Sequence, residues 1–414
     1  MGIFDVFRRR AWSRDEFAAR VIQRARSLVQ ATSANYDADS FQIQFELPGG
    51  RPFTMMLHNA FTDTGKVARG ERDRVIDKYV LALTETQSDT PGDLATHLMP
   101  VIRDAGMFSW ASLSARLTSD AGPAKLPWST PFSGDLSITL VQDLEHATRT
   151  VNPTALSDAG LDEESAFTRA LANLRDRTQD GGMERHGGVW VSTWHDVYDA
   201  SRILLTDMIH RLPVHGVPVA MIPSRDHLLV TGSLDDDGIA LIASLAADIL
   251  ENDTRPMSPQ LFILREGTWT PFEAPLPPDI KRRLTLARYK RLDGMYGDQK
   301  TLLEKIHDKE QVDVFVATYR AAQNTETGRI TGSAQWTRDV RTLLPECDLL
   351  WLLCRQRNEL LEIEWADALP HVPELRQPHG DLVPPRYLLT QFPDDATYAL
   401  LREKATYVKA VSPG

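Results

Sequence analysis

Cysteine is scarce in this chain of 414 residues, where Cys347 and Cys354 are the only two. Two cysteines cannot build the disulfide framework of a small secreted domain, so we expect a reducing, cytoplasmic location. No apolar run approaches the roughly 20 residues that cross a bilayer, so we expect no stable membrane insertion. The 46 Lys and Arg are outnumbered by 57 Asp and Glu, and the net charge of −11 argues against a specific nucleic-acid binder.

Sequence motifs of catalysis are missing as well. The chain has no HExxH, no Walker A run and no GxGxxG. Ser224 and Ser233 lack the glycine frame of a nucleophile elbow. His195, His210 and His215 are the nearest approach to a histidine cluster, but their spacing fits no metal motif. We therefore expect no catalytic residue, no metal and no cofactor.

The N-terminal segment, residues 1–11, is interpreted as a tail. It lacks the apolar core and small-residue cleavage site of a signal peptide. Gly2 begins like a myristoylation motif, but Val6 stands where Ser or Thr is needed. Ile3, Phe4 and Phe7 beside the basic residues 8–10 leave a second interpretation open, a short amphipathic foot on a membrane or partner.

The most regular passage of the chain is residues 217–272. Two apolar runs flank the polar turn 224–227 and predict a hairpin, and apolar residues spaced three and four apart over 239–250 predict a helix. A second hairpin follows over 261–272, turning at Glu266 and Gly267. Hairpin, helix and hairpin predict an α+β protein of small mixed or antiparallel sheets covered by helices.

Four regions follow from the rest of the chain, whose length exceeds that of one ordinary core. They are a tail, residues 1–11; a helix–hairpin–helix α+β unit, 12–90; an α+β core, 91–275; and an α+β extension, 276–414. Ser13 and Glu16 form the capping box of the first helix. Residues 88–92 predict a linker, and the prolines of 274–278 a stiff boundary before the extension.

The extension is predicted to begin with a basic helix, residues 281–291, that ends near Gly294. This helix either grips phosphates or an acidic partner, or pairs with the acidic remainder of the chain. A short helix over 302–306, strands and a closing helix follow; the expected strands are 312–316, 330–336, 348–353, 360–365 and 387–391. Cys347 and Cys354 lie seven apart, which places them on opposite faces of a strand as ordinary thiols.

Four segments of the core carry a resemblance to a known family. They are residues 98–104 (LMPVIRD), 189–205 (VWVSTWHDVYDASRILL), 217–233 (VPVAMIPSRDHLLVTGS) and 261–272 (LFILREGTWTPF). In order and spacing they are similar to the YtpQ-like family, bacterial cytoplasmic proteins treated as a domain of unknown function. The resemblance covers residues 12–275 and implies a fold and a location. It implies no catalytic residue, and the extension departs from the pattern.

Two acidic positions have competing interpretations. The run Asp235–Asp236–Asp237 either holds a hard cation or caps the helix that follows it. Asp199 stands where the N-cap of a helix reaching His210 is expected.

Asp199 also belongs to a candidate groove. It either forms an i,i+3 ion pair with Arg202 or lines a groove together with Arg202, Arg225 and Asp226. The ion pair is the structural interpretation and the groove the functional one.

The absence of catalytic motifs favours a non-catalytic protein-interaction module, an adaptor, chaperone-like or immunity-type protein with a protein partner. We expect residues 276–414 to choose that partner, through strands such as 312–316 or 360–365 at a sheet edge. The alternative is a small-molecule or nucleotide hydrolase with an unrecognised Asp/His/Arg site. Convergent polar residues in an enclosed pocket favour the enzyme.

Overall fold

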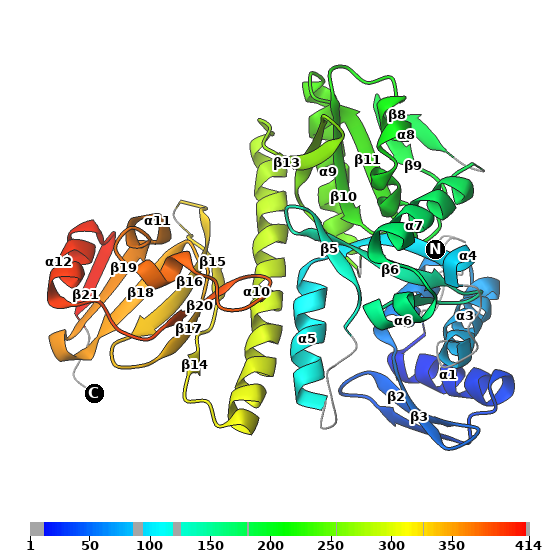
Figure 1. Ribbon diagram of the computed structural model, residues 1–414, viewed down its shortest axis with the longest axis horizontal. Helices are drawn as coiled ribbons and strands as arrows, with labels where there is room; N and C mark the ends of the chain where they lie inside the picture. Colours follow the sequence, from blue (N-terminus) through cyan, green and yellow to red (C-terminus); the bar gives the residue numbers. More distant parts are fainter. Residues whose placement is uncertain are drawn as a thin grey trace, which may run out of the picture. The chain divides into compact units, whose positions relative to one another are not determined.

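The computed structural model describes residues 12–85, 94–118, 126–179, 182–253, 255–325 and 327–410. The predicted tail 1–11 and linker 88–92 lie outside these residues. Helices mix with small, mostly antiparallel sheets, which confirms the α+β prediction (Figure 1). The chain divides into two compact units, the first made of residues up to Met99 together with Val141–Val151 and Glu164–Asn173, the second of the remainder.

The first unit contains a three-stranded antiparallel sheet of order β1-β2-β3 together with helices. Its elements are α1 (Arg14–Leu28), β1 (Ser33–Asp37), β2 (Gln42–Leu47), β3 (Arg51–Met56), α2 (His58–Lys66), α3 (Arg72–Glu85), α4 (Leu94–His97) and β7 (Thr148–Thr150). The predicted capping box is present, since Ser13 and Glu16 each accept the other's backbone N–H. The sequence interpretation missed β1, which extends the expected hairpin to a three-stranded sheet, and it missed α2.

The core of this unit contains a cluster of phenylalanines among aliphatic side chains. Phe17 of α1 packs edge-on against Phe61 of α2, with ring centroids 5.2 Å apart, and Phe41 lies against both. Buried aromatic pairs in this geometry stabilise a fold beyond the area that they bury. Two arginines of α1 pair with Asp73 and Asp77 of α3 and fix the register of the two helices.

A six-stranded antiparallel sheet of order β13-β12-β10-β11-β9-β8 is the centre of the second unit. Its strands are β8 (Met183–His186), β9 (Val189–Ser192), β10 (Pro218–Ser224), β11 (His227–Gly232), β12 (Leu261–Arg265) and β13 (Thr268–Phe272). Figure 1 shows α9 (Asp236–Asn252) lying along this sheet. Both predicted hairpins and the helix between them are confirmed. Glu266 and Gly267 turn the second hairpin with φ of 49° and 77°, a backbone that favours glycine.

The chain also forms a smaller sheet of order β4-β6-β5, in which β7 pairs with β6. The elements around it are β4 (Leu98–Asp104), α5 (Gly106–Thr118), β5 (Ser129–Ser133), β6 (Leu136–Asp143), α6 (Pro153–Asp158) and α7 (Glu163–Arg177). Between β9 and β10 the chain forms a short 3₁₀ helix, Ala200–Leu204, and then α8, Thr206–His210. The single helix predicted from Asp199 to His210 is therefore wrong, because the backbone leaves the helical region at Leu205.

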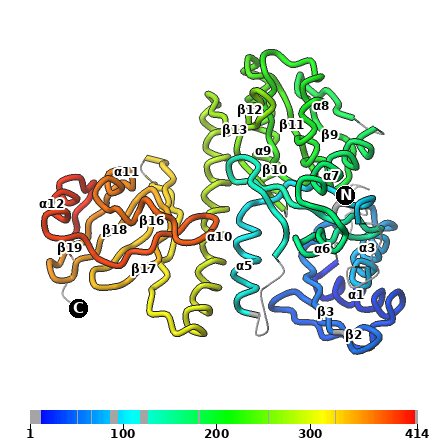
Figure 2. The backbone as a smooth tube through the Cα atoms, viewed as in Figure 1, coloured from blue at the N-terminus to red at the C-terminus, as the bar shows by residue number. Residues whose placement is uncertain are grey.

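One continuous helix, α10 (Pro278–Glu310), follows the second hairpin. The prediction of a basic helix ending near Gly294 and a separate helix over 302–306 is wrong. Glycine inside a helix costs about 1 kcal/mol, but buried side chains on both sides of Gly294, such as Tyr289, Tyr296 and Leu303, outweigh that cost. The tube in Figure 2 follows α10 into the C-terminal strands. A domain boundary near 274–280 stays a prediction.

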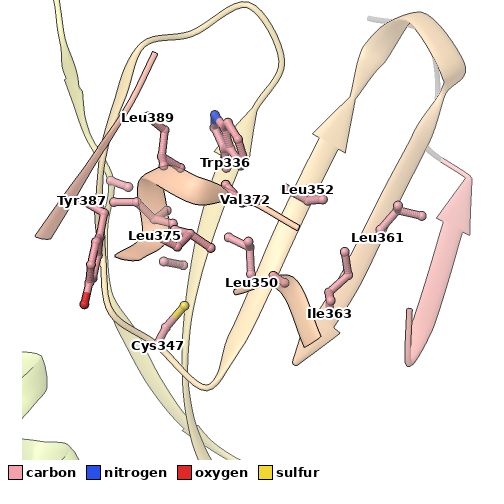
Figure 3. Close-up of a cluster of buried hydrophobic side chains, with 14 of the residues drawn as sticks. Trp336, Cys347, Leu350, Leu352, Leu361, Ile363, Val372, Leu375, Tyr387 and Leu389 are labelled. Carbon is pink, nitrogen blue, oxygen red and sulfur yellow. The ribbon is translucent and has the colours of Figure 1, made fainter. Parts of the chain in front are cut away.

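The C-terminal residues form two sheets, of order β14-β17-β20 and β15-β16-β18-β19-β21. Their elements are β14 (Phe315–Val316), β15 (Arg320–Gln323), β16 (Ile330–Thr337), β17 (Thr342–Pro345), β18 (Leu349–Cys354), β19 (Glu359–Glu364), α11 (Trp365–Ala368), β20 (Arg386–Leu389), α12 (Asp395–Lys404) and β21 (Tyr407–Ala410). Figure 3 shows their shared apolar core around Trp336, Leu350 and Leu361.

Two predictions for this region are wrong. Residues 360–365 are not a sheet edge, because β19 lies between β18 and β21. Cys347 and Cys354 do not face opposite ways: Cys347 precedes β18, and both thiols are buried in one core cluster. Among the described residues no helix combines the length and the apolar character that crossing a bilayer requires.

Candidate functional site

The loop before the 3₁₀ helix holds a buried ion pair. Arg202, which is 0% exposed, donates to both carboxylate oxygens of Asp196 at 2.7 and 2.8 Å, and its Nε donates to Thr178 Oγ1 at 3.0 Å. The Trp194 ring covers this guanidinium, with its centroid 4.2 Å from Cζ. Burial acts to raise the pKa of Asp196, but the bonds from Arg202 outweigh it, so that this pKa is lowered. The pair locks the loop in place.

Asp199 has no such partner. It is 0% exposed, and among the described residues neither carboxylate oxygen has a hydrogen bond of normal geometry; the Ser192 hydroxyl and the His195 N–H are nearby polar groups. Burial, with a smaller effect from Asp196, raises the pKa of Asp199. The predicted N-cap at Asp199 is wrong, because its side chain makes no capping bond. The predicted ion pair between Asp199 and Arg202 is also wrong, because Arg202 pairs with Asp196.

Three segments far apart in the sequence meet at this loop. Ala200 donates its N–H to the Arg225 carbonyl oxygen at 3.1 Å, and Ile102 of β4 donates to Ser201 Oγ at 3.1 Å. Of the predicted groove residues, the structure thus places Asp199 beside the turn that carries Arg225 and Asp226. The Arg202 side chain is committed to its own ion pair.

The turn between β10 and β11 contains a serine–histidine contact. Ser224 Oγ lies 2.8 Å from His227 Nδ1, and the Asp226 N–H donates to the same hydroxyl at 3.3 Å. Burial lowers the pKa of His227, although carboxyl groups of Asp253, Asp226 and Asp199 act in the other direction. The hydrogen bond between the Ser224 hydroxyl and His227 Nδ1 spans the turn, and its direction depends on the His227 tautomer. Ser224 is 0% exposed, so this hydroxyl does not meet solvent.

Arg103, at the end of β4, lies near the same turn. Its guanidinium donates one hydrogen bond, to the Ile102 carbonyl oxygen at 2.8 Å. Burial, together with the positive charges of Arg225 and Arg255, lowers the pKa of Arg103 to about 10, while Asp226 acts to raise it. The sequence interpretation missed Arg103 because an arginine at the end of an apolar strand carries no local signal of its neighbours.

A hollow of about 370 Å³ opens beside Trp194. Its wall is largely apolar and its rim carries two arginines, both bonded to Asp207. The lining residues are Arg175, Thr178, Gln179, Gly182, Met183, Trp194, Leu205, Met208, Arg211 and Leu212. Neither Asp199 nor His227 lines it, so the titratable groups and the hollow are separate features.

The other sequence candidates have structural roles. Asp235 caps α9 by accepting the Gly238 N–H at 2.9 Å, which confirms the capping interpretation. In the basic segment 281–291, Arg283 pairs with Asp248 and Glu251 of α9, and Arg291 with two aspartates beside β4 and β6. These pairs confirm that the segment neutralises acidic groups of its own chain.

His195, His210 and His215 do not gather. In the described part of the chain one group has metal-ligand spacing, Glu85, Glu145 and His146 of the first unit. Glu145 is 81% exposed, and Glu85 accepts the His146 N–H at 2.8 Å, which explains their proximity without an ion. The sequence interpretation did not anticipate this group, since Glu85 is 61 residues away from His146 in the chain.

Comparison with known proteins gives distant relatives. The chain resembles UPF0354 proteins. It is 24% identical over 146 residues to one from Bacillus cytotoxicus and 25% identical over 146 residues to one from Bacillus mycoides, covering 34% of this chain and 54% of each relative. The chain thus matches about half the length of these curated relatives, which are uncharacterised bacterial proteins. No family model matches, and no solved structure does. The narrower YtpQ-like resemblance stays a prediction.

Proposed function

We propose that the protein is a non-catalytic, cytoplasmic binding protein, and that the hollow beside Trp194 receives an apolar side chain from a protein partner. The composition of the hollow supports this proposal. Tryptophan, methionine and arginine are enriched at the centres of protein interfaces, and methionine adapts its shape to different side chains. Met183, Met208 and Trp194 line one hollow here.

The rim defines the chemistry of the partner. Arg175 donates to both oxygens of Asp207, at 2.6 and 2.9 Å, and Arg211 donates to the same carboxylate at 2.6 Å. Two guanidinium groups share one carboxylate, which leaves one positive charge at the mouth. The hollow therefore suits a bulky apolar residue flanked by acidic ones.

The hydrolase alternative has one observation in its favour, the contact between Ser224 and His227. A nucleophile must reach its substrate, and Ser224 is 0% exposed and absent from the lining of the hollow. Because a substrate cannot reach Ser224, the serine–histidine contact does not favour the hydrolase over the binding protein.

The test uses an array of peptides with a central Phe, Leu or Ala flanked by Glu, Ala or Lys, applied to the full-length chain. We expect binding to peptides with an apolar centre and Glu flanks, and about tenfold weaker binding by Met208→Gln. Met56→Gln is the matched control, because Met56 is 53% exposed on β3 of the first unit. Indifference of the peptides to their central residue, or equal loss in both variants, contradicts the proposal.

The same protein tests where the partner is chosen. Affinity purification from native host cells, with mass spectrometry, compares wild type with Met208→Gln and Trp351→Ser. Trp351 stands in β18 of the C-terminal extension, against the half-exposed Tyr407. If residues 276–414 select the partner, as we expect, the wild-type chain captures a protein that the Trp351→Ser variant does not capture. A protein lost only with Met208→Gln assigns the choice to the hollow instead.

A further inference from the structure

A second hollow, of about 250 Å³, lies between α5, α10 and the loop before β20, all within the second compact unit. The two helices pack side by side (Figure 1). The volume of this α5–α10 hollow is below the roughly 300–1,000 Å³ of pockets that hold drug-sized ligands, so it suits a smaller molecule. The lining residues are Asp104, Gly106, Met107, Trp110, Met295, Asp298, Gln299 and Val383.

Hydrogen bonds hold the frame of the α5–α10 hollow. Gln299 is buried, and its side-chain amide donates to the Pro384 carbonyl oxygen at 2.9 Å, which ties α10 to the loop before β20. Arg291 of α10 pairs with Asp104, the last residue of β4, which ties α10 to the segment that leads into α5. All three walls are therefore ordered in the free protein.

Most of the wall is apolar, and part of it meets solvent. Trp110 is 48% exposed and Met107 39% exposed, and the two lie three residues apart on one face of α5. Met295 lines the hollow from α10, and Gly106 leaves room for it, because a Cβ at position 106 would collide with the Met295 methyl group. Tryptophan is highly buried on average in folded proteins. A half-exposed indole in the wall of a hollow therefore offers its ring to a ligand.

The charge at the α5–α10 hollow is negative. Asp104 and Asp298 contribute carboxylates, and the described lining residues include no lysine or arginine. Arg291 pairs with Asp104, whereas the exposed Asp298 forms no ion pair within the part of the chain that the structure describes. The face of an aromatic ring carries partial negative charge, so Trp110 and the carboxylate of Asp298 both attract a cation.

We propose that the α5–α10 hollow binds a small aliphatic ammonium ion. The cationic group meets the Trp110 ring and the Asp298 carboxylate, and the alkyl part lies against the methionine side chains, which adapt to its shape. The α5–α10 hollow shares no described lining residue with the hollow beside Trp194, so this proposal does not depend on the function of that hollow.

The test is calorimetry of the full-length chain with butylammonium or tetramethylammonium chloride, against sodium chloride at matched ionic strength. We expect saturable binding of both ammonium ions and weaker binding of butanol, a neutral chain of similar size. Trp110→Leu and Asp298→Asn should each weaken the binding about tenfold, and Trp110→Phe should keep part of it. Asp308→Asn is the matched control, because Asp308 is an exposed carboxylate of the same helix outside the lining of the hollow.

Three results overturn the proposal. Equal binding of butanol shows that the hollow takes a neutral group. Equal weakening by Asp298→Asn and Asp308→Asn shows a general attraction of cations to an acidic surface. A short peptide with one lysine that binds more tightly than butylammonium assigns the hollow to the side chain of a protein partner instead of a small molecule.

A second measurement does not depend on the variants folding. A carbodiimide with a neutral hydrazide labels accessible carboxylates, and mass spectrometry of the wild-type chain locates the labelled positions. Tetramethylammonium is the protecting ligand, because it cannot react as a nucleophile. We expect it to protect Asp298 and to leave Asp308 labelled. Labelling of Asp298 that does not change with tetramethylammonium contradicts the proposal.

Discussion

Two arginines in different regions of the protein have a similarly lowered pKa and differ in their hydrogen bonds. Burial lowers the pKa of Arg103, near the central sheet, and of Arg386, in the C-terminal region, to about 10 in each case. Arg386 nevertheless donates to Gln299 Oε1 and to the carbonyl oxygens of Tyr296, Ala317 and Leu343, at 2.8 to 3.2 Å. Arg103 donates one bond. The pKa of a buried arginine therefore does not tell whether it is structural; its hydrogen bonds do.

The largest expected effect is at Arg386. Arg386→Met keeps the length of the side chain but leaves buried carbonyl oxygens and Gln299 without their donor, and we expect the free energy of unfolding to fall by about 4 kcal/mol. Urea denaturation followed by circular dichroism measures it. Arg265→Met, at an exposed position, is the control. A loss no greater than the control's shows that the C-terminal region does not depend on this arginine.

Arg202 lies between the two extremes, because each of its three guanidinium nitrogens donates a hydrogen bond and its main partner is a carboxylate. Arg202→Met leaves Asp196 half-buried without its cation, which we expect to cost about 3 kcal/mol. The double variant Arg202→Met, Asp196→Leu removes both charges and should recover part of that loss. If the double variant is as unstable as the single one, packing of Arg202 on Trp194 matters more than the ion pair.

Asp199 tests the same comparison with a buried carboxyl group in place of an arginine. Because its pKa is raised in the folded chain, folding favours the protonated form, and the associated stability is lost as pH rises through the folded pKa. Asp199→Asn removes this dependence, and we expect the variant to be more stable than wild type by about 1 kcal/mol at pH 7. The difference should vanish below about pH 3, where Asp199 is protonated in the folded and the unfolded chain alike. Thermal unfolding across that range measures it, and a constant difference contradicts the assignment.

The smallest expected effect is at Arg103. Since Arg103 donates one hydrogen bond among the described residues, Arg103→Gln should change the free energy of unfolding by no more than about 0.5 kcal/mol. Urea denaturation followed by circular dichroism measures it. A large loss places Arg103 with Arg386, as a structural arginine.

Local patterns predicted local structure well. The hairpins around residues 224–227 and 266–267, α9 and the cap at Asp235 all depend on residues close in sequence. The predicted helix end near Gly294 is wrong, because tertiary packing of α10 outweighs the low helix propensity of glycine.

The candidate site depends on contacts that no local pattern reveals. Arg202 pairs with Asp196, six residues before it, although Asp199 lies only three residues before it at the start of the same 3₁₀ helix. Arg103 meets Arg225 only through the folding of separate strands. Sequence reasoning named Asp199 and Arg225 from a motif and a turn, but could not assign their partners.

The length of α10 has a mechanical consequence. Its 33 residues form a rod of about 50 Å at 1.5 Å per residue, without a break at either glycine. Arg283 ties one stretch of the rod to α9, and Tyr296 and Gln299 donate to carbonyl oxygens just before β20. A rod held at several points along its length transmits a twist or a shift from one attachment to the next. We therefore expect a movement of the chain at Pro278, where α10 begins, to displace the residues just before β20.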